Sequence, residues 1–443
     1  MGYLDVDFKF HNVGQGLFYT GRLSYGRAAF NFVYDCGSER NSLVKDAIDR
    51  AIYQEFESDK KIDLLIISHL HADHANGIPY LLEQVKDVDT VILPYLSPLE
   101  RLIVALETPR SAEDEEFYNF LVNPVMFLLD REAKRVILLG GEEANRRENW
   151  MPPFERPPDL PPEVEDITID IDTLPDYEPL ILEISRLEPE LTEYIKTRRL
   201  FVKNHSGALQ LRMGKFPLWI FRLFNYKVRS NILSQFENCV REILGSTDST
   251  TIKSAILDKN KRNKLKTCYT KLSKYLKSDF NNTSLIVLHL PAFVPNRIEC
   301  WAVWGCRPYL CCSPYCRNLE WLYYDEWLYE PPIIDPRQFS QFLTGDISLK
   351  FKFNEISHHF GLGDAITHTM ATLIPHHGSG NNWNNKLCKK ISSSFWVVSA
   401  GIRNRYCHPS KQVLNAICSN CHYSRVVWVN ETTFFGLMGT FEF

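Results

Sequence analysis

The sequence predicts an α/β fold in which buried strands end in clusters of histidine and aspartate. Three observations support this. The apolar run 62–67 has the composition of a buried strand and leads into the loop Ser68–Ile78, SHLHADHANGI. Helix-like and strand-like periodicities alternate around that loop. Further strand-like runs near residues 341, 371 and 395 also end in side chains that bind metals or phosphates.

Composition describes a globular chain with a large core. The chain has 443 residues, a formal net charge of −4, 44% hydrophobic residues and 23% charged residues. This balance gives no global sign of a nucleic-acid binder, so any such surface must be local. We find no signal peptide and no apolar run that could span a bilayer, and we expect a cytoplasmic protein without membrane contact. In that compartment, the twelve cysteines predict free thiols or metal ligands rather than disulfides.

Residues 1–95 are predicted to form the first half of the fold. Alternating patterns predict a strand meander over 4–36 and a strand near 90–93, and helical spacing predicts helices over 40–57 and near 78–86. The loop after strand 62–67 carries four potential metal ligands: His69, His71, Asp73 and His74. Two histidines at i and i+2 can face one metal, while the following Asp and His can face a second.

Residues 96–280 depart from this pattern and are predicted to be an insertion. Helical stretches at 99–107 and 115–129 lead to a strand at 135–139, and another strand is expected at 208–213. The segment 152–190 between them is rich in proline and acid and is expected to be an exposed linker or surface loop. The region also offers a surface for a protein partner.

A basic helical stretch, 251–278, closes this region. Its lysines and arginine, including Lys261, Arg262 and Lys264, alternate with apolar residues. One interpretation is the solvated face of an amphipathic helix pair. The alternative is a contact with a phosphate backbone, in which these three residues bind substrate.

Residues 281–443 are predicted to form the second half of the fold. A strand is expected at 283–290, followed by a Cys-rich insertion at 292–330. The insertion holds Cys300, Cys306, Cys311, Cys312 and Cys316. It lacks paired Cys-x-x-Cys motifs, so a hairpin with free thiols is favoured over a structural zinc site.

A second set of candidate ligands follows the later strands. Asp346 comes after Gly345 at the end of one strand, and the pair His376–His377 precedes Gly378 at the end of another. A third strand ends in the loop 402–410, which carries Arg403, Arg405 and His408. Each signal is weak alone, but an α/β sheet places its site at such strand ends.

With these motifs assembled, the chain resembles the metallo-β-lactamase fold and, within it, the soluble hydrolase domain of ComEC-type competence proteins. The resemblance covers about 5–95 and 280–443 and implies an αβ/βα four-layer sandwich of two mixed sheets with helices outside. It is carried by Asn12–Gly16, Val33–Gly37, the SHLHADH loop, Asn281–Val287, Leu343–Ile347, Ile374–Ser379 and Asn404–Ser410.

The resemblance implies two divalent metal ions, with zinc expected and manganese as the alternative. His69 and His71 would bind the first ion. Asp73 and His74 would bind the second, Asp346 would bridge them, one of His376 and His377 would complete the second site, and Asp35 would brace the loop. Gly378 slightly favours His377 as the ligand. The third histidine of the superfamily pattern has no clear counterpart, and His205 and His289 are candidates.

The predicted function is that of a metal-dependent phosphodiester hydrolase, foremost a stand-alone nuclease that uses a metal-bridged hydroxide. Asp73 would orient the hydroxide, and Arg403, Arg405, Ser379 and His408 would meet the substrate. A role in antiviral defence or a toxin system is analogy alone. Two alternatives stay open. One is a hydrolase of a small phosphodiester or ester, such as a cyclic nucleotide or choline phosphate, and the other is a non-enzymatic binding module.

Overall fold

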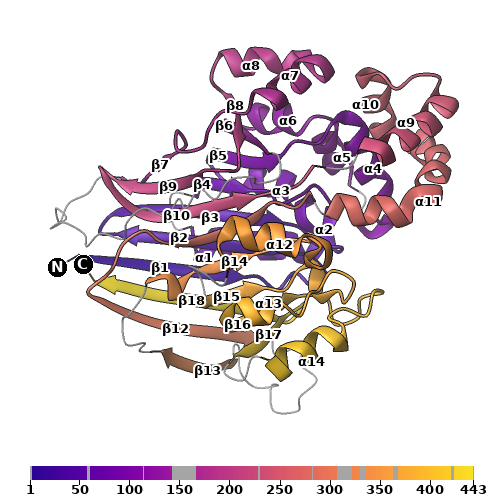
Figure 1. Cartoon of the computed structure of the whole chain (residues 1–443). Helices are drawn as coiled ribbons and strands as arrows, with labels where there is room; N and C mark the ends of the chain where they lie inside the picture. Colours follow the sequence, from indigo (N-terminus) through magenta and orange to yellow (C-terminus); the bar gives the residue numbers. More distant parts are fainter. Residues whose placement is uncertain are drawn as a thin grey trace.

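The protein is built on two mixed β-sheets that pack face to face (Figure 1). This computed structural model describes residues 2–56, 60–112, 114–141, 166–227, 230–281, 283–306, 322–329, 336–362, 368–420 and 424–442. Both ends of the described chain lie together at one end of the sheets, and helix α2 (Ala72–Ala75) lies toward the other end (Figure 1). The loop expected to carry the site is therefore remote from the termini.

Within the described residues, the first sheet has ten strands in the order β13-β12-β18-β1-β2-β3-β4-β5-β6-β8. Its strands from β3 to β8 run parallel, and the others pair antiparallel. Their bounds are β1 Tyr3–Phe10, β2 Phe18–Tyr25, β3 Ala28–Cys36, β4 Lys61–Ile66, β5 Asp87–Pro94, β6 Ala133–Gly140, β8 Leu200–Asn204, β12 Arg297–Cys306, β13 Leu322–Tyr329 and β18 Thr433–Glu442. The parallel half carries the crossover helices, and its strand ends supply the loops that concern function.

Over the same described ranges, the second sheet has eight strands in the order β17-β16-β15-β14-β11-β10-β9-β7. Strands β14 to β17 run parallel, and β7 to β14 pair antiparallel. Their bounds are β7 Thr168–Asp170, β9 Ala208–Met213, β10 Phe216–Phe224, β11 Ile286–Pro291, β14 Gln341–Leu343, β15 His368–Leu373, β16 Ser392–Ser399 and β17 Arg425–Val429.

Three apolar clusters hold the layers together. One lies between the sheets, one joins the first sheet to α1, α3–α6, α10 and α11, and one joins the second sheet to α12–α14. The helices are α1 Asn41–Gln54, α3 Ile78–Gln84, α4 Pro98–Glu107, α5 Glu115–Val122, α6 Pro124–Asp130, α7 Glu178–Leu187, α8 Thr192–Lys196, α9 Ser230–Leu244, α10 Ser249–Leu257, α11 Lys259–Asn281, α12 Leu349–Phe360, α13 Leu387–Lys390 and α14 Lys411–Asn420. None of the described helices combines the length and apolar composition needed to cross a bilayer.

The strands and helices predicted for residues 1–95 are present. The stretch 115–129 divides into α5 and α6, because the Asn123 side chain accepts the Met126 N–H at 3.1 Å and Pro124 begins the second helix. The basic stretch forms the expected helix pair, α10 and α11.

More of the range 96–280 belongs to the two sheets than the sequence predicted. Strands β6 to β10 all come from it and join both sheets. Its proline- and acid-rich segment was expected to lack regular structure, and this was wrong for part of it. Within the described residues, α7 begins with Pro179 in its first turn, where proline needs no N–H partner. The three-part division of the chain stays a prediction.

One cysteine prediction was wrong. Cys239 of α9 and Cys268 of α11 form a disulfide, with Cα atoms 5.7 Å apart. Only the packing of two helices distant in sequence brings these thiols together, so no sequence motif marks them. Among the Cys-rich residues, Cys300 of β12 is buried. Cys311, Cys312 and Cys316 lie outside the described residues, and the zinc alternative there stays untested.

Candidate metal centre

The candidate ligands converge from both sheets. The loop after β4 supplies His69, His71, Asp73 and His74, while Asp346 follows β14 and the short helix η5 (His376–Gly378) follows β15. Parallel strands deliver their carboxyl ends to one edge, which is where an α/β fold places its site. Three overlapping groups have donor atoms within 4.8 Å of one another: Asp73, His74, Asp346 and His377; Asp35, His69 and His74; and His69, His71 and Asp73.

The inward ring nitrogens of the loop histidines have the form that a metal requires. The Nε2 atoms of His69, His71 and His74 are buried and form no hydrogen bond of good geometry within the described part of the chain. Carboxylate oxygens nevertheless lie close to all three. Buried polar atoms rarely stay unsatisfied, and such a cluster is explained by an ion that the histidines are placed to bind.

One carboxylate faces two groups of nitrogens. Oδ1 of Asp346 is 3.2 Å from Nε2 of His74 and 3.8 Å from Nε2 of His377, while its Oδ2 is 3.8 Å from Nε2 of His69. Asp73 Oδ2 lies 3.2 Å from Nε2 of His377. Two ligands about 2.1 Å from a tetrahedral ion lie ~3.4 Å apart, so these separations fit donors arranged around two ions.

Hydrogen bonds behind the histidines set their tautomers. Asp35 accepts the Ser68 N–H at 2.6 Å, the Ser68 hydroxyl at 2.6 Å and the Nδ1–H of His74 at 2.8 Å. Because the Ser68 hydroxyl donates to Asp35, its oxygen accepts from Nδ1 of His69 at 2.9 Å. His377 donates Nδ1–H to the Ser399 carbonyl at 2.6 Å. Each of the three rings therefore keeps its Nε2 lone pair directed inward.

The electrostatics hold two of the candidate ligands, His69 and Asp346, in their metal-binding forms. Burial and the neighbouring His74 hold the pKa of His69 well below its usual value, so this ring is neutral. Burial raises the pKa of Asp346, but the charges of His376 and His74 outweigh it and hold the pKa well below its usual value. His69 is thus a neutral imidazole and Asp346 an ionised carboxylate at pH 7. Burial disfavours the charged forms of His71, His74 and His377, but the carboxylates around them outweigh burial and raise the pKa of these rings, so a metal ion would displace a proton there.

The geometry separates His376 from His377. Nδ1 of His376 faces the Asn281 amide nitrogen at 3.0 Å, and accepting that N–H puts the ring proton on Nε2. A protonated Nε2 cannot bind a metal but can donate a hydrogen bond. In His377 the proton is on Nδ1, so Nε2 can bind a metal. This agrees with the sequence analysis, which slightly favoured His377 as the ligand.

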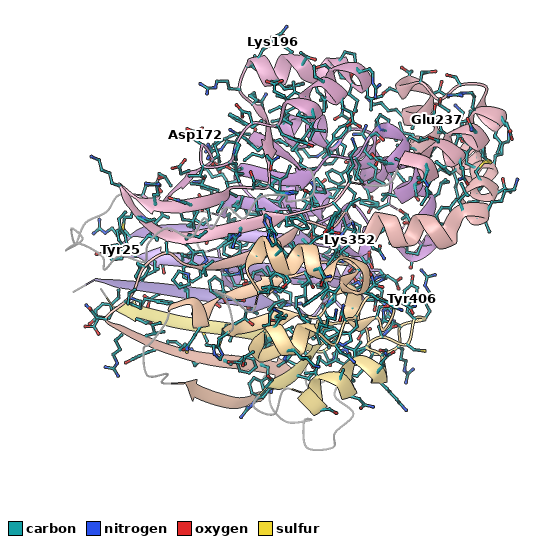
Figure 2. The ribbon with its side chains drawn as sticks, viewed as in Figure 1. Tyr25, Asp172, Lys196, Glu237, Lys352 and Tyr406 are labelled. Carbon is teal, nitrogen blue, oxygen red and sulfur yellow. A yellow bond between two sulfur atoms is a disulfide. The ribbon has the colours of Figure 1, made fainter. Side chains whose placement is uncertain are left out.

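A cavity of about 410 Å³ opens in front of the ligands. Arg405 and His408 line it, together with Ser379, all three of which were predicted to meet substrate. Tyr406 also lines the cavity and is labelled at the right of Figure 2. Its ring stacks on His408, and its hydroxyl and the Arg405 guanidinium both donate hydrogen bonds to Glu39. Arg403 is exposed and is not among the lining residues.

His408 is neutral at pH 7. Burial, with the charges of His377 and His376, lowers its pKa to about 4. Its Nδ1 is buried and has no hydrogen-bond partner among the described residues. A neutral ring at the cavity can donate one hydrogen bond to a phosphate, but it does not hold the proton needed to act as a general acid.

Lys261, Arg262 and Lys264 are not among the described residues that line the cavity. Arg262 is 6% exposed, donates to the Ile256 carbonyl and lies 3.7 Å from the Tyr118 ring centroid. This burial argues against a phosphate contact for Arg262. Lys261 donates to the Ser254 hydroxyl at 2.9 Å, and Lys264 is exposed.

Neither candidate for the third histidine lies in the ligand groups. His289 bonds Tyr19 and Trp219 between the sheets, and His205 bonds Asn225. Sequence reasoning missed Ser284, which accepts the Asp346 N–H and contacts His69, although it belongs to a motif that the resemblance used. It also missed Glu107, the last residue of α4, whose Oε2 lies 2.6 Å from Nε2 of His71. The sequence around Glu107 carries no motif that marks it.

Comparison with known proteins supports the fold. Residues 26–179 match the family model described as the metallo-beta-lactamase superfamily, a range that runs from β3 into α7 and includes the His-rich loop. Proteins of this superfamily are mostly metal-dependent hydrolases, and the His/Asp cluster agrees with that class. No curated protein matches the chain. The ComEC-type resemblance stays a prediction.

Proposed function

We propose that this protein is a metal-dependent phosphodiester hydrolase, with nucleic acid as the first candidate substrate. The observation that carries the proposal is the position of Asp346, whose two carboxylate oxygens face two separate groups of inward imidazoles. This donor set suits two zinc ions, with manganese as the alternative. When bound, such a pair supplies a water of lowered pKa and offsets charge on a phosphate oxygen.

The chain's own side chains have distinct roles in this proposal. Asp73 binds one ion and orients the attacking water through its second oxygen. His376 donates its Nε2–H toward the substrate, and neutral His408 donates a further hydrogen bond to the phosphate. Arg405 at the cavity edge offers a guanidinium fork to two phosphate oxygens. These donors hold a phosphate that is in line with the water.

The charge of the cavity supports an anionic substrate with a single charge. Its lining includes the carboxylates of Glu39, Asp73, Glu107 and Asp346 and the guanidinium of Arg405. Ionised, these groups carry three net negative charges, and two divalent cations would convert that to one net positive charge. A phosphodiester carries one negative charge and would neutralise this site. A phosphomonoester dianion would leave one net negative charge.

A small phosphodiester is the second candidate. The cavity volume of about 410 Å³ is in the range that holds a molecule of nucleotide size, and Lys261, Lys264 and Arg403 are not among its lining residues. A polymer would require these cations to contact phosphates outside the cavity. A cyclic nucleotide would need none of them.

Metal analysis with a substrate panel tests the proposal. Purified protein should contain about two metal ions per chain and hydrolyse bis(4-nitrophenyl) phosphate, and single- and double-stranded DNA and RNA and cyclic nucleotides would identify the substrate. Asp73→Ala should abolish hydrolysis, and Asp172→Ala should not, because Asp172 lies at the far side of the molecule from Tyr406 (Figure 2). Absence of both bound metal and hydrolysis would favour the binding module.

A further inference from the structure

We propose that Glu107 is the ligand that completes the first metal site, in the place where the superfamily pattern has a third histidine, and that Tyr269 positions it. The inference rests on the proposed two-metal function. Its basis is a close contact: Nε2 of His71 lies 2.6 Å from Oε2 of Glu107, with the two side chains 15% and 10% exposed. Both residues line the cavity.

The first site is one donor short without Glu107. Among the described residues, Asp73 lies with His69 and His71, and Asp346 lies 3.8 Å from His69, but both carboxylates also face His377. If Asp73 binds the second ion, the first site keeps two nitrogens and one bridging oxygen, whereas a zinc site usually has four donors. Ser284 does not fill the gap, because its hydroxyl contacts the Nδ1 side of His69, behind the ring. Glu107 instead meets His71 at Nε2, the nitrogen that would bind the ion.

The distance between His71 and Glu107 is compatible with a metal ion bound between the two side chains. At 2.6 Å, Nε2 of His71 and Oε2 of Glu107 are in ion-pair contact, without the geometry of a hydrogen bond among the described residues. Two ligands of one tetrahedral ion lie ~3.4 Å apart, so a small rotation of the glutamate side chain would admit the metal. A set of two histidines and a glutamate is a known zinc ligand set, and its carboxylate also suits manganese.

The place of Glu107 in its helix supports a cationic partner. It is the last residue of α4, which begins with the capping pair Ser97 and Glu100. A carboxylate at a helix C-terminus meets the negative end of the helix dipole, which is unfavourable. A carboxylate that is only 10% exposed is unfavourable as an anion unless a cation and hydrogen-bond donors compensate it.

Tyr269 of α11 supplies such a donor. Its hydroxyl donates to Oε1 of Glu107 at 2.6 Å, which leaves Oε2 directed at His71. A hydrogen bond to the second oxygen of a ligating carboxylate fixes its orientation. Tyr269 follows Cys268, whose disulfide to Cys239 fastens α11 to α9 (the yellow bond in Figure 2). Helices α9 and α11 are thereby connected to the first metal site through Tyr269 and Glu107.

The test is zinc stoichiometry in the full chain, with Glu107→Gln, Tyr269→Phe and the exposed control Glu193→Gln. Zinc would be titrated calorimetrically into metal-free protein, and bound metal counted by mass spectrometry after dialysis. We expect two equivalents for the wild type and the control, one for Glu107→Gln, and a 10- to 100-fold weaker affinity at one site for Tyr269→Phe. Tyr269→Phe removes only a hydroxyl, so it tests the inference independently if Glu107→Gln does not fold.

The outcomes separate this inference from the proposed function. Two equivalents of wild-type affinity in both Glu107→Gln and Tyr269→Phe would overturn the role of Glu107 while leaving the two-metal proposal intact. A wild-type protein that binds no zinc or manganese and hydrolyses nothing would overturn both. Loss of one equivalent in Glu107→Gln with hydrolysis lost and the second site unchanged would support both.

Discussion

Replacing Asp35 by Asn tests the tautomer arrangement behind the metal centre. Asp35 is fully buried and has a positive φ of 58°, a conformation that Asn adopts as readily as Asp. In the variant, Oδ1 can still accept the Ser68 N–H. The new amide NH₂ would replace Oδ2, which now accepts from both the Ser68 hydroxyl and His74.

That exchange reverses two hydrogen bonds at once. An amide NH₂ donates to Nδ1 of His74, which moves the ring proton to Nε2 and blocks the lone pair that a metal needs. It also donates to the Ser68 oxygen, so the hydroxyl turns toward His69 and shifts that tautomer as well. Loss of such a supporting partner usually costs 10- to 100-fold in metal affinity, or about 1.4–2.7 kcal/mol. With both sites affected, loading of the pair should weaken by roughly 10²- to 10⁴-fold.

Zinc titration of metal-free protein measures this effect, with Asp63→Asn as the matched control. Asp63 is another buried carboxylate that accepts a backbone N–H, from Asn31, but it does not belong to the ligand groups. The control should lose stability without losing zinc affinity. Asp35→Ala should also unfold more easily, by ~3–5 kcal/mol, because His74 loses a buried partner. Two zinc equivalents of wild-type affinity in Asp35→Asn would refute the reasoning.

The other predictions concern the cavity, the basic helix and a distant ion pair. His408→Ala should keep both metals and lose about 10²- to 10³-fold in kcat on bis(4-nitrophenyl) phosphate, and an unchanged kcat would exclude His408 from the reaction. Lys261→Ala with Lys264→Ala should weaken single-stranded DNA binding and lower the slope of log K against log salt by about 0.7 per lost contact, whereas an unchanged slope leaves a solvated helix face. Glu55→Gln should lower the free energy of unfolding at pH 7 by about 1–2 kcal/mol, because Glu55 bonds Lys9 at 2.8 Å. Burial opposes ionisation of Glu55, but His11 and Lys9 outweigh it and lower its pKa, so its contribution is complete above the unfolded pKa of ~4.3 and is lost as the pH falls through the lower folded pKa. Urea unfolding should therefore show a smaller gap between wild type and Glu55→Gln at pH 3 than at pH 7, and an equal gap would contradict the assignment.

Local pattern was sufficient for the candidate ligands. The SHLHADH loop, the Gly-Asp pair at 345–346 and the double histidine at 376–377 each follow a strand whose apolar run is legible in the sequence. Parallel strands of one sheet end at the same edge, which places Asp346 near the double histidine in the second sheet. Their meeting with the SHLHADH loop of the first sheet depends on how the two sheets pack, and the sequence reached it only through the family resemblance.

Residues whose role depends on packing were beyond sequence reasoning. Glu107 ends an ordinary amphipathic helix, and only the seating of α4 beside the loop brings it to His71. Arg262 looked like its lysine neighbours, yet it is buried under Tyr118. The cysteine pair on α9 and α11 likewise depends on helix packing. In each case the deciding contact is distant in sequence and leaves no periodic signal.

The place of β18 in the first sheet constrains how the chain can be assembled during synthesis. β18 lies between β1 and β12, with Tyr3 opposite Glu442 on one side and Arg297 opposite Glu442 on the other. Until β18 has left the ribosome, β1 and β12 each keep an unpaired edge, which is a template for pairing with other chains. A nascent chain stalled before residue 433 would thus be prone to aggregate even with its ligand loops already made. Ribosome-bound chains ending before and after β18 should differ in solubility for this reason.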